Sequence, residues 1–479
     1  MKLEEFLKTK GYDLTDKMLI KPYQDMWLQW YKGDVPKFQN YTIYNGTRRV
    51  KCKRFTLNTA KKISEDFANI ILNEKVQYHI GNETTQNEIN NILDANDFYT
   101  MANQQIEKMC ALGEVAFVLS LGDLLYDKEA GVISTEQAKL NIAYLTCDKI
   151  YPLSNDGTKI TECAFATYKK VNNVSLCVLS IHHKDDNGFY VIDNYTFEVT
   201  RSGDLVDISD KMEDTLRHLE TGSNNPWFVI IKPPVANNIN LESMEGVSTF
   251  ANSIDVLKGI DIIYDSFINE FILGKKRIFV KGDLLQADTS TGEVKLVFDT
   301  NDVVFHIMPG TTEEGNDIQE VNMDLRMQEH KEAIQTALNL LSSKIGLGEN
   351  RYEFNKAGLT TATQVISENS EMYRTIKKYE IQVENGLVDL FTSICYIAKT
   401  FLGLSVEENP EITIDFDDSI IEDKAENKRQ AMLEYNAGLI DKIQYYVITR
   451  EMTREQAEKF LNTMDLPEDE EDEEEPTQE

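Results

Sequence analysis

The most constraining feature of the sequence is one long helical pattern, from Thr361 to about Leu402, which would span roughly 60 Å if unbroken. It is mostly polar up to Glu380, whereas from Ile381 onward apolar residues recur every three or four positions over a broad face. This change predicts that one end lies in a core while the other runs along a wetter surface. Gly386 is a candidate position for a kink.

Two further helical patterns bracket a short β-rich stretch. The first runs from Gly246 to Leu273 and the second from Asn322 to Ile345. The first carries a seam with three-four spacing, whose members are Val247, Phe250, Ile254, Leu257, Asp261, Tyr264, Ile268 and Phe271. A seam with one charged member is typical of helices that pack against copies of themselves in a fixed register. A surface helix on a single globular core would give the same pattern.

The N-terminal half reads as helices followed by strands. Leu57–Glu74 is a strongly amphipathic helical pattern, and Asn87–Gly113 predicts one or two more helices. From Val115 to about Val199, short β-rich runs separated by turn residues predict an antiparallel meander. Trp227–Ile231 should be a strand that either lies at an edge or ends at the prolines that follow it, because they cannot donate ladder hydrogen bonds.

The C-terminal part predicts a short strand after Pro410, a helix over Glu422–Ala437 and a last helix opened by a capping box at Thr453. The acidic run from Glu468 to Glu475 cannot pack against itself and predicts disorder. The whole chain is therefore expected to be α+β and predominantly helical.

The formal net charge of −32 excludes a protein that grips nucleic acid over most of its surface. This charge could simply keep the protein soluble, or it could belong to a surface past which DNA must slide without binding. No apolar run is long enough to cross a bilayer, and the N-terminus lacks the apolar core of a secretory signal, so we expect no membrane contact and a cytoplasmic site of synthesis. Six scattered cysteines without a CxxC pair predict reduced, mostly buried thiols.

The sequence offers little catalytic chemistry. It has no phosphate loop, dinucleotide fingerprint, HExxH motif or nucleophile elbow. His182 and His183 should point to opposite faces of a strand and cannot chelate one ion side by side. We therefore predict no catalytic residue, no metal site and no cofactor.

Two alternatives remain open at this level. The acids between Asp415 and Asp423 could serve a metal-dependent nuclease or a capsid-associated hydrolase, or could simply cap a helix N-terminus. The chain could also be a monomeric scaffold or adaptor protein. The basic run of Lys275, Lys276 and Arg277 could touch phosphate at a projecting tip or complement a helix C-terminus.

The ordered set of segments resembles the portal proteins, or head–tail connectors, of double-stranded DNA phages with long non-contractile tails. Four stretches carry the resemblance, and a fifth is weaker. They are Trp30–Gly33, Leu57–Lys75, Pro233–Val280, Thr360–Glu380 and, more weakly, Asp415–Lys442.

The resemblance implies a dodecameric ring of structural subunits, each with a wing, stem, clip and crown. Residues 1–245 would be the wing, to which a long kinked helix over 361–414 returns. Residues 246–273 and 321–346 would be the stem, 274–320 the clip, 347–360 the tunnel loop, 415–466 the crown and 467–479 a disordered tail. The seam listed above would pack between subunits. The tunnel-loop residues near DNA would be Arg351, Tyr352, Asn355 and Lys356.

The resemblance also implies partners. The clip, with Lys275, Lys276 and Arg277, would dock the terminase large subunit and later the head-completion adaptor. The wing would contact major capsid and scaffolding proteins. Double-stranded DNA would pass through the channel without sequence preference, and the protein would reside in the virion at the portal vertex of the capsid.

Overall fold

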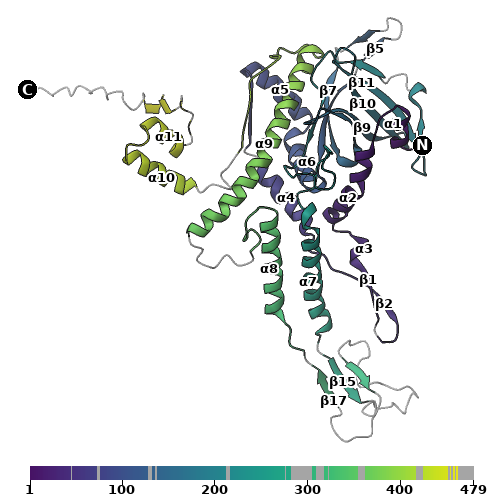
Figure 1. Ribbon diagram of the computed structural model, residues 1–479, viewed down its shortest axis with the longest axis vertical. Coiled ribbons are helices and arrows are strands. Elements are labelled where there is room, and N and C mark those ends of the chain that lie inside the picture. Colours follow the sequence, from purple (N-terminus) through teal and green to yellow (C-terminus); the bar gives the residue numbers. More distant parts are fainter. Residues whose placement is uncertain are drawn as a thin grey trace, which may run out of the picture. The chain divides into compact units, whose positions relative to one another are not determined.

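The computed structural model describes most of the 479-residue chain (Figure 1). The described residues are 1–44, 46–72, 76–123, 125–127, 132–134, 138–211, 216–275, 277–281, 305–308, 318–321, 323–353, 362–416, 424–450, 452, 454, 457–458 and 460–461. The chain divides into two compact units, Met1–Phe416 and Asp417–Glu479.

The N-terminal helices pack around an apolar core. They are α1 (Leu3–Thr9), α2 (Thr15–Lys32), α3 (Pro36–Gln39), α4 (Thr59–Ile71), α5 (Glu83–Ala95) and α6 (Phe98–Leu112). The amphipathic pattern of α4 is confirmed, because Ile63, Phe67 and Ile71 are fully buried. Of the one or two helices predicted over Asn87–Gly113, the structure has two, α5 and α6, and α5 begins earlier, at Glu83. The Asn82 side chain caps α5 by accepting a hydrogen bond from the Thr85 backbone N–H at 2.9 Å.

The larger sheet is an antiparallel meander, as predicted, but it begins at Ile150, and the strands between Val115 and Thr146 belong to other sheets. Its strand order is β12-β11-β10-β9-β8, with β13 also paired to β11. The strands are β8 (Ile150–Asn155), β9 (Ile160–Val171), β10 (Val174–Lys184), β11 (Tyr190–Val199), β12 (Leu205–Asp207) and β13 (His218–Glu220). Helix α1 lies against this sheet, where the Phe6 ring is 4.9 Å from Tyr195 and 5.0 Å from Phe197.

A second sheet has the order β14-β4-β7, made of β14 (Phe228–Ile231), β4 (Val115–Gly122) and β7 (Lys139–Thr146). The strand predicted before Pro233 is β14, and it lies at the edge as expected. Short elements complete this half of the chain. They are β5 (Leu125–Asp127), β6 (Val132–Ser134) and the 3-10 turns Cys147–Lys149, Ser209–Lys211 and Ala251–Ser253.

Helix α9 (Ala362–Thr400) is the long helix that the sequence predicts. In its second half Val383, Leu387 and Phe391 are fully buried, which confirms the broad apolar face. Gly386 has a packing role there, because a Cβ at this position would lie 2.7 Å from the Ile231 side chain of β14. Beyond α9, β18 (Ile412–Asp415) pairs antiparallel with β3 (Gln77–Ile80).

The prediction of a predominantly helical chain is not supported. The structure is 47% helical and 24% strand, because the region from β4 to β14 is rich in paired strands. In the second unit, α10 (Lys424–Asn436) ends before Gly438, whose φ is +70°. Helix α11 (Lys442–Arg450) was not predicted, because its aromatic and β-branched residues favour strands.

Two further observations concern the chemistry of the chain. No helix within the described ranges is both long and apolar enough to cross a bilayer. All six cysteines are free thiols, and all except Cys52 are buried, in agreement with the prediction from their spacing.

Phe391→Ala tests the anchoring of α9. The ring lies 5.2 Å from that of Tyr78 and 5.7 Å from that of Phe98, so its removal should leave a cavity that costs about 3–5 kcal/mol of unfolding free energy. Denaturant unfolding followed by circular dichroism measures the loss. Gln382→Ala, at an exposed position of the same helix, is the control and should change little. Equal losses in the two variants would contradict this account.

Candidate subunit interface and channel segments

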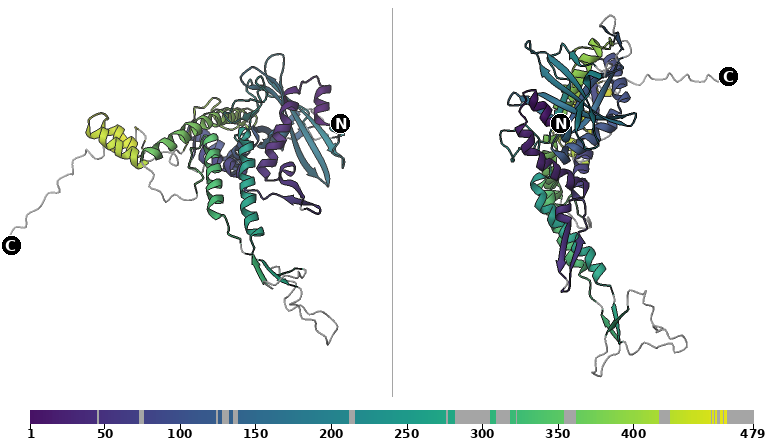
Figure 2. Two further views of the ribbon diagram at one scale, coloured as in Figure 1. Left: turned by 60° about the horizontal axis from the view of Figure 1, so that its bottom comes forward. Right: turned by 90° about the vertical axis from the view of Figure 1, so that its right-hand side faces the viewer.

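Helices α7 (Ile254–Leu273) and α8 (Met327–Lys344) run side by side (Figures 1 and 2). An ion pair joins them where α7 ends and α8 begins. The Arg326 guanidinium donates from Nε to Glu270 Oε1 at 2.9 Å and from Nη2 to Glu270 Oε2 at 2.8 Å, and His330 Nε2 lies 3.6 Å from Glu270 Oε2. These hydrogen bonds lower the pKa of Glu270 to about 2. The pair fixes the register of the two helices at this end.

Both helices begin later than the sequence predicts. Residues 246–253 do not join α7, because their polar groups bond to α6 instead. The Thr249 N–H and the Ser248 hydroxyl both donate to the Cys110 carbonyl, at 2.9 and 3.1 Å. Gly246 lies so close to Gly113 that a Cβ on it would meet the Gly113 oxygen at 1.8 Å. Likewise α8 begins at Met327, immediately after the residue that pairs with Glu270.

The predicted seam divides into two halves. Val247, Phe250, Ile254 and Leu257 are buried within the same chain and offer almost no surface to another copy. The prediction that these four residues pack between subunits is therefore wrong for this chain, because its own core encloses them. Tyr264 and Ile268 are half-buried, and Phe271 is exposed.

Asp261, the charged member of the seam, has a partner within its own chain. Its carboxylate accepts a hydrogen bond from the Leu57 backbone N–H at 2.9 Å, and Asp265 accepts one from the Phe55 N–H at 3.0 Å. Burial raises the pKa of Asp261. The two carboxylates thus fix the segment before α4 against α7.

Apolar side chains remain exposed near the ends and along the outer faces of the helix pair. They are Ile262, Phe271, Ile272 and Leu273 of α7, Met323 and Leu325 before α8, and Met327 and Leu340 of α8. Exposed apolar residues gathered on one pair of helices favour an interface with another protein.

Three strands lie where the sequence predicts a β module between the two helices. Strand β15 (Arg277–Lys281) pairs parallel with β16 (Phe305–Met308) and antiparallel with β17 (Ile318–Val321). Of the predicted docking residues, Lys275 is exposed and Arg277 begins β15, whereas Lys276 lies outside the described residues. The β-rich run at residues 293–298 also lies outside them.

The segment after α8 folds back on that helix. Gln335 Nε2 donates to the Tyr352 carbonyl at 3.3 Å, and Asn339 Nδ2 donates to Asn350 Oδ1 at 3.4 Å. Burial, followed by the charge of Asp66, raises the pKa of Tyr352, so its phenol is enclosed by the chain itself. Arg351 is half-buried. The other two predicted tunnel-loop residues, Asn355 and Lys356, lie outside the described residues.

The alternative metal site is only partly described. The Asp415 carboxylate, at the end of β18, lies 3.4 Å from His79 Nε2, whereas residues 417–423 lie outside the described chain. Within the described ranges, no three His, Cys, Asp or Glu side chains gather as a metal site would require. His182 is buried, which lowers its pKa to about 3, while His183 Nε2 contacts Asp193 at 2.9 Å. The two imidazoles therefore face opposite ways, as predicted.

A buried charged cluster escaped the sequence reasoning. Lys17 Nζ donates to the Cys147 carbonyl at 2.7 Å and to Gln24 Oε1 at 3.2 Å. It also lies 3.5 Å from Glu114 Oε1 and 3.6 Å from Glu245 Oε2. These side chains come from α2, the loop before β4 and the segment before α7, up to 228 positions apart in sequence, so no local motif marks them.

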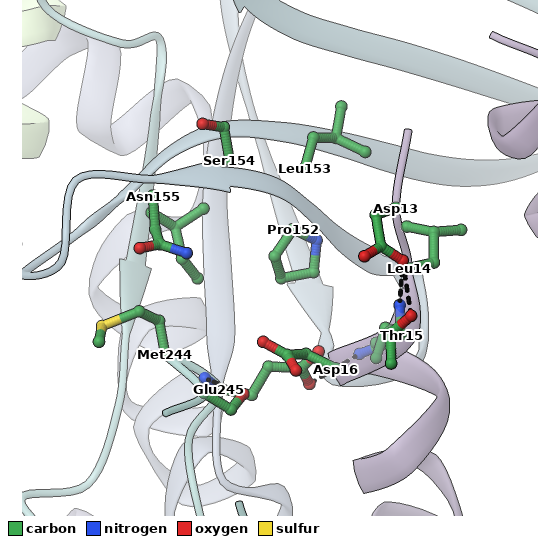
Figure 3. Close-up of a pocket in the computed structure, with 13 residues that line it drawn as sticks. Asp13, Leu14, Thr15, Asp16, Pro152, Leu153, Ser154, Asn155, Met244 and Glu245 are labelled. Carbon is green, nitrogen blue, oxygen red and sulfur yellow. Dashed lines mark hydrogen bonds and ion pairs between the residues drawn. The ribbon is translucent and has the colours of Figure 1, made fainter. Parts of the chain in front are cut away.

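The cluster holds two carboxylates and one ammonium group in a nearly dry environment. Burial, with the adjacent charge of Glu114, raises the pKa of Glu245 to about 8. Figure 3 shows the neighbouring cavity of about 200 Å³, which Asp16 of α2, Ser154 and Asn155 of β8, and Glu245 line from three segments. Because Lys17 contacts both Glu114 and Glu245, the cluster ties these three segments together structurally.

Residues 14–462 match a protein family described as phage portal protein, SPP1 Gp6-like. The chain belongs to this family of phage portal proteins. The match covers α7 and α8, the segment that follows them, and the two sheets that precede α7. None of the curated proteins matches the sequence.

Phage portal proteins are structural, non-enzymatic capsid components that work as oligomers, so membership places this portal protein in that class. The family resemblance inferred from the five sequence stretches is confirmed. A catalytic role for the acids around Asp415 has no support in this family.

Glu245→Gln tests the buried cluster. In the folded state Glu245 stays protonated up to about pH 8, whereas in the unfolded chain it ionises near 4.5. The folded state therefore holds an extra proton between these values, and stability falls as pH rises through this window. In the variant, the free energy of unfolding should fall less steeply with pH, by up to about 1.4 kcal/mol per pH unit. Unfolding at pH 5 to 8 measures it, with the exposed Glu242→Gln as control. An unchanged slope would refute the assignment.

Proposed function

We propose that copies of this portal protein form a ring, expected to be dodecameric, at one vertex of a phage capsid. Double-stranded DNA would be packaged through its channel by the terminase and later ejected through it, and the ring would be a platform for head–tail joining. The observation that carries this proposal is the family match over residues 14–462, since it spans the paired helices with their exposed apolar side chains.

The helix pair supplies surface for assembly. Leu273 on α7 is 60% exposed and Leu340 on α8 is 59% exposed, which is unfavourable for residues of this size on a monomer. A head-to-tail interface that closes into a ring brings one face of each copy against a different face of the next. In such a ring the C-terminal half of the seam, with Tyr264, Ile268 and Phe271, would contact the neighbouring copy.

The acidic composition suits a conduit. Each contact between a cation and a phosphate adds affinity, so a chain of net charge −32 would let DNA slide with little friction. Within this proposal Arg351, Asn355 and Lys356 make a few exchangeable contacts at the constriction. Tyr352 is better placed to anchor the loop, because its carbonyl bonds to α8 and its hydroxyl oxygen is buried.

The remaining parts follow the same proposal. The sheet of β15, β16 and β17, with Lys275 and Arg277 at its entry, would dock the terminase large subunit and then the head-completion adaptor. The sheets and helices before α7 would contact major capsid and scaffolding proteins. The division into wing, stem, clip, tunnel loop and crown is part of this proposal.

Leu340→Glu tests the ring directly. A carboxylate in a tightly packed apolar contact is costly, so the variant should remain smaller than the wild-type ring at equal concentration. Sedimentation velocity and negative-stain images of annular particles measure assembly. Val206→Glu, at a similarly exposed apolar position of β12, should assemble normally. A wild-type chain that stays monomeric at every concentration would refute the proposed function.

A Gly-Ser segment of equal length in place of residues 354–359 tests the channel loop. This change keeps Asn350 and Tyr352 on α8, so ring assembly should be intact while DNA packaging or retention falls. Protection of packaged DNA from nuclease, in reactions with terminase and ATP, measures the effect. The same replacement of the exposed turn at residues 201–203 is the control. Packaging at the wild-type level would count against a role for the loop.

A further inference from the structure

A two-stranded ribbon precedes α4. It consists of β1 (Asn40–Tyr44) and β2 (Arg49–Lys53), which pair antiparallel with each other and with no other described strand. Figures 1 and 2 show it on the side of α7 opposite to α8. A hairpin of this kind is only marginally stable in water unless something else packs on it.

The charge of this region is opposite to that of the chain. Between Asp34 and Glu65 the sequence has eight basic residues and no acidic residue, within a protein of net charge −32. The basic residues are Lys37, Arg48, Arg49, Lys51, Lys53, Arg54, Lys61 and Lys62.

Some of these cations are used inside the chain. The Arg54 guanidinium lies 4.4 Å from the centre of the Tyr41 ring, Lys61 pairs with Glu107, and Lys62 pairs with Asp66 at 2.8 Å. The three cations of β2, which are Arg49, Lys51 and Lys53, do not have such contacts with the described residues. These three are exposed and make no ion pair with any residue in the described part of the chain.

The three cations share one face of the ribbon. They alternate along β2, so their side chains point the same way at intervals of about 7 Å. Their cross-strand neighbours are Tyr44 for Arg49, Thr42 for Lys51 and Asn40 for Lys53, none of which is acidic. Because like charges in a row repel, an anionic surface on this face would stabilise the ribbon.

The ribbon is fixed in direction by its base. The chain leaves β2 through Phe55 and Leu57, whose backbone N–H groups bond to Asp265 and Asp261 of α7. The cationic face is therefore presented at a defined place beside α7.

We propose that this cationic face docks on α8 of the next copy in the ring. The inference rests on the proposed ring. A head-to-tail ring turns the side of α7 that carries the ribbon towards the opposite side of the next copy, which carries α8. Exposed acids lie there, with Asp324 just before α8 and Glu329 and Glu332 on it, and they complement the charge of the ribbon.

A second copy fits this face better than nucleic acid does. Each copy carries 32 excess negative charges, so the assembled ring repels DNA from its outer surfaces and attracts isolated basic elements of its own subunits. The interaction would also set the direction of assembly, since the ribbon and α8 lie on opposite sides of α7.

The test compares two triple variants of the full chain. Arg49→Gln, Lys51→Gln and Lys53→Gln together should raise the protein concentration needed for half-assembly about tenfold at low salt and weaken its salt dependence. The control combines Lys169→Gln, Lys170→Gln and Arg201→Gln, which remove the same charge from exposed positions of the larger sheet region. Sedimentation measures assembly, and an unchanged thermal unfolding of the monomer excludes misfolding.

Charge exchange and cross-linking identify the partner. Asp324→Lys, Glu329→Lys and Glu332→Lys together should impair assembly, and Arg49→Glu, Lys51→Glu and Lys53→Glu in the same chain should restore it. In rings mixed from ¹⁴N and ¹⁵N copies, carbodiimide should join Lys51 or Lys53 of one isotope to an acid of α8 of the other.

Three results would overturn the inference. The first is assembly of the ribbon variant like wild type at all salt concentrations, and the second is cross-links confined to single copies. The third is normal assembly with a selective loss of DNA binding, which would make the ribbon a nucleic-acid surface. If the wild-type chain forms no ring, the proposed function is overturned as well. Sedimentation of the wild-type chain alone shows this, so the two failures can be told apart.

Discussion

Two buried carboxylates on α7 organise the middle of this protein. Asp261 and Asp265 can lie in the interior only because the backbone N–H groups of Leu57 and Phe55 donate to them. These hydrogen bonds set where the chain leaves the ribbon and where α4 begins. The same two hydrogen bonds therefore position the ribbon and the start of α4 relative to α7. In the sequence, Asp261 looks like a residue that sets the register between subunits. In the structure, it accepts a hydrogen bond within its own chain.

The packing of α7 changes along its length. Near its start, Ile254 and Leu257 are enclosed by the chain's own core, whereas its last turn exposes Phe271, Ile272 and Leu273. The ion pair of Glu270 with Arg326 keeps α8 beside that exposed end. A rigid pair of helices that is buried at one end and apolar at the other is a suitable element for assembly, because little conformational entropy remains to be lost on association.

Charge is distributed unevenly over the portal protein. The net value of −32 describes a surface that disfavours DNA, yet one ribbon carries three cations with no partner among the described residues. The acidic composition suits the proposed function, since a channel for DNA would have to avoid binding the DNA that passes through it. The ribbon is where the same long-range electrostatics can act between copies. The signal for it was in the sequence, as a run of basic residues uninterrupted by acids.

Periodicity and turn chemistry are local properties, and they determined a good part of the fold from the sequence alone. They placed α4, α9 and its apolar half, the edge strand before Pro233 and the β module between two helices. Each of these depends on residues within one or two turns of each other. The family, too, follows from the order of such segments.

Only the tertiary structure decided how distant polar groups pair. The segment before α7 is held against α6, because the Thr249 N–H and the Ser248 hydroxyl both donate to the Cys110 carbonyl. The carboxylates of Glu114 and Glu245 meet Lys17 across more than ninety positions of sequence. The spacing of Asp261 along the helix is the same whether its partner lies on another subunit or is the Leu57 backbone N–H of its own chain. Burial and hydrogen-bond satisfaction are properties of the folded neighbourhood, and a linear pattern does not contain them.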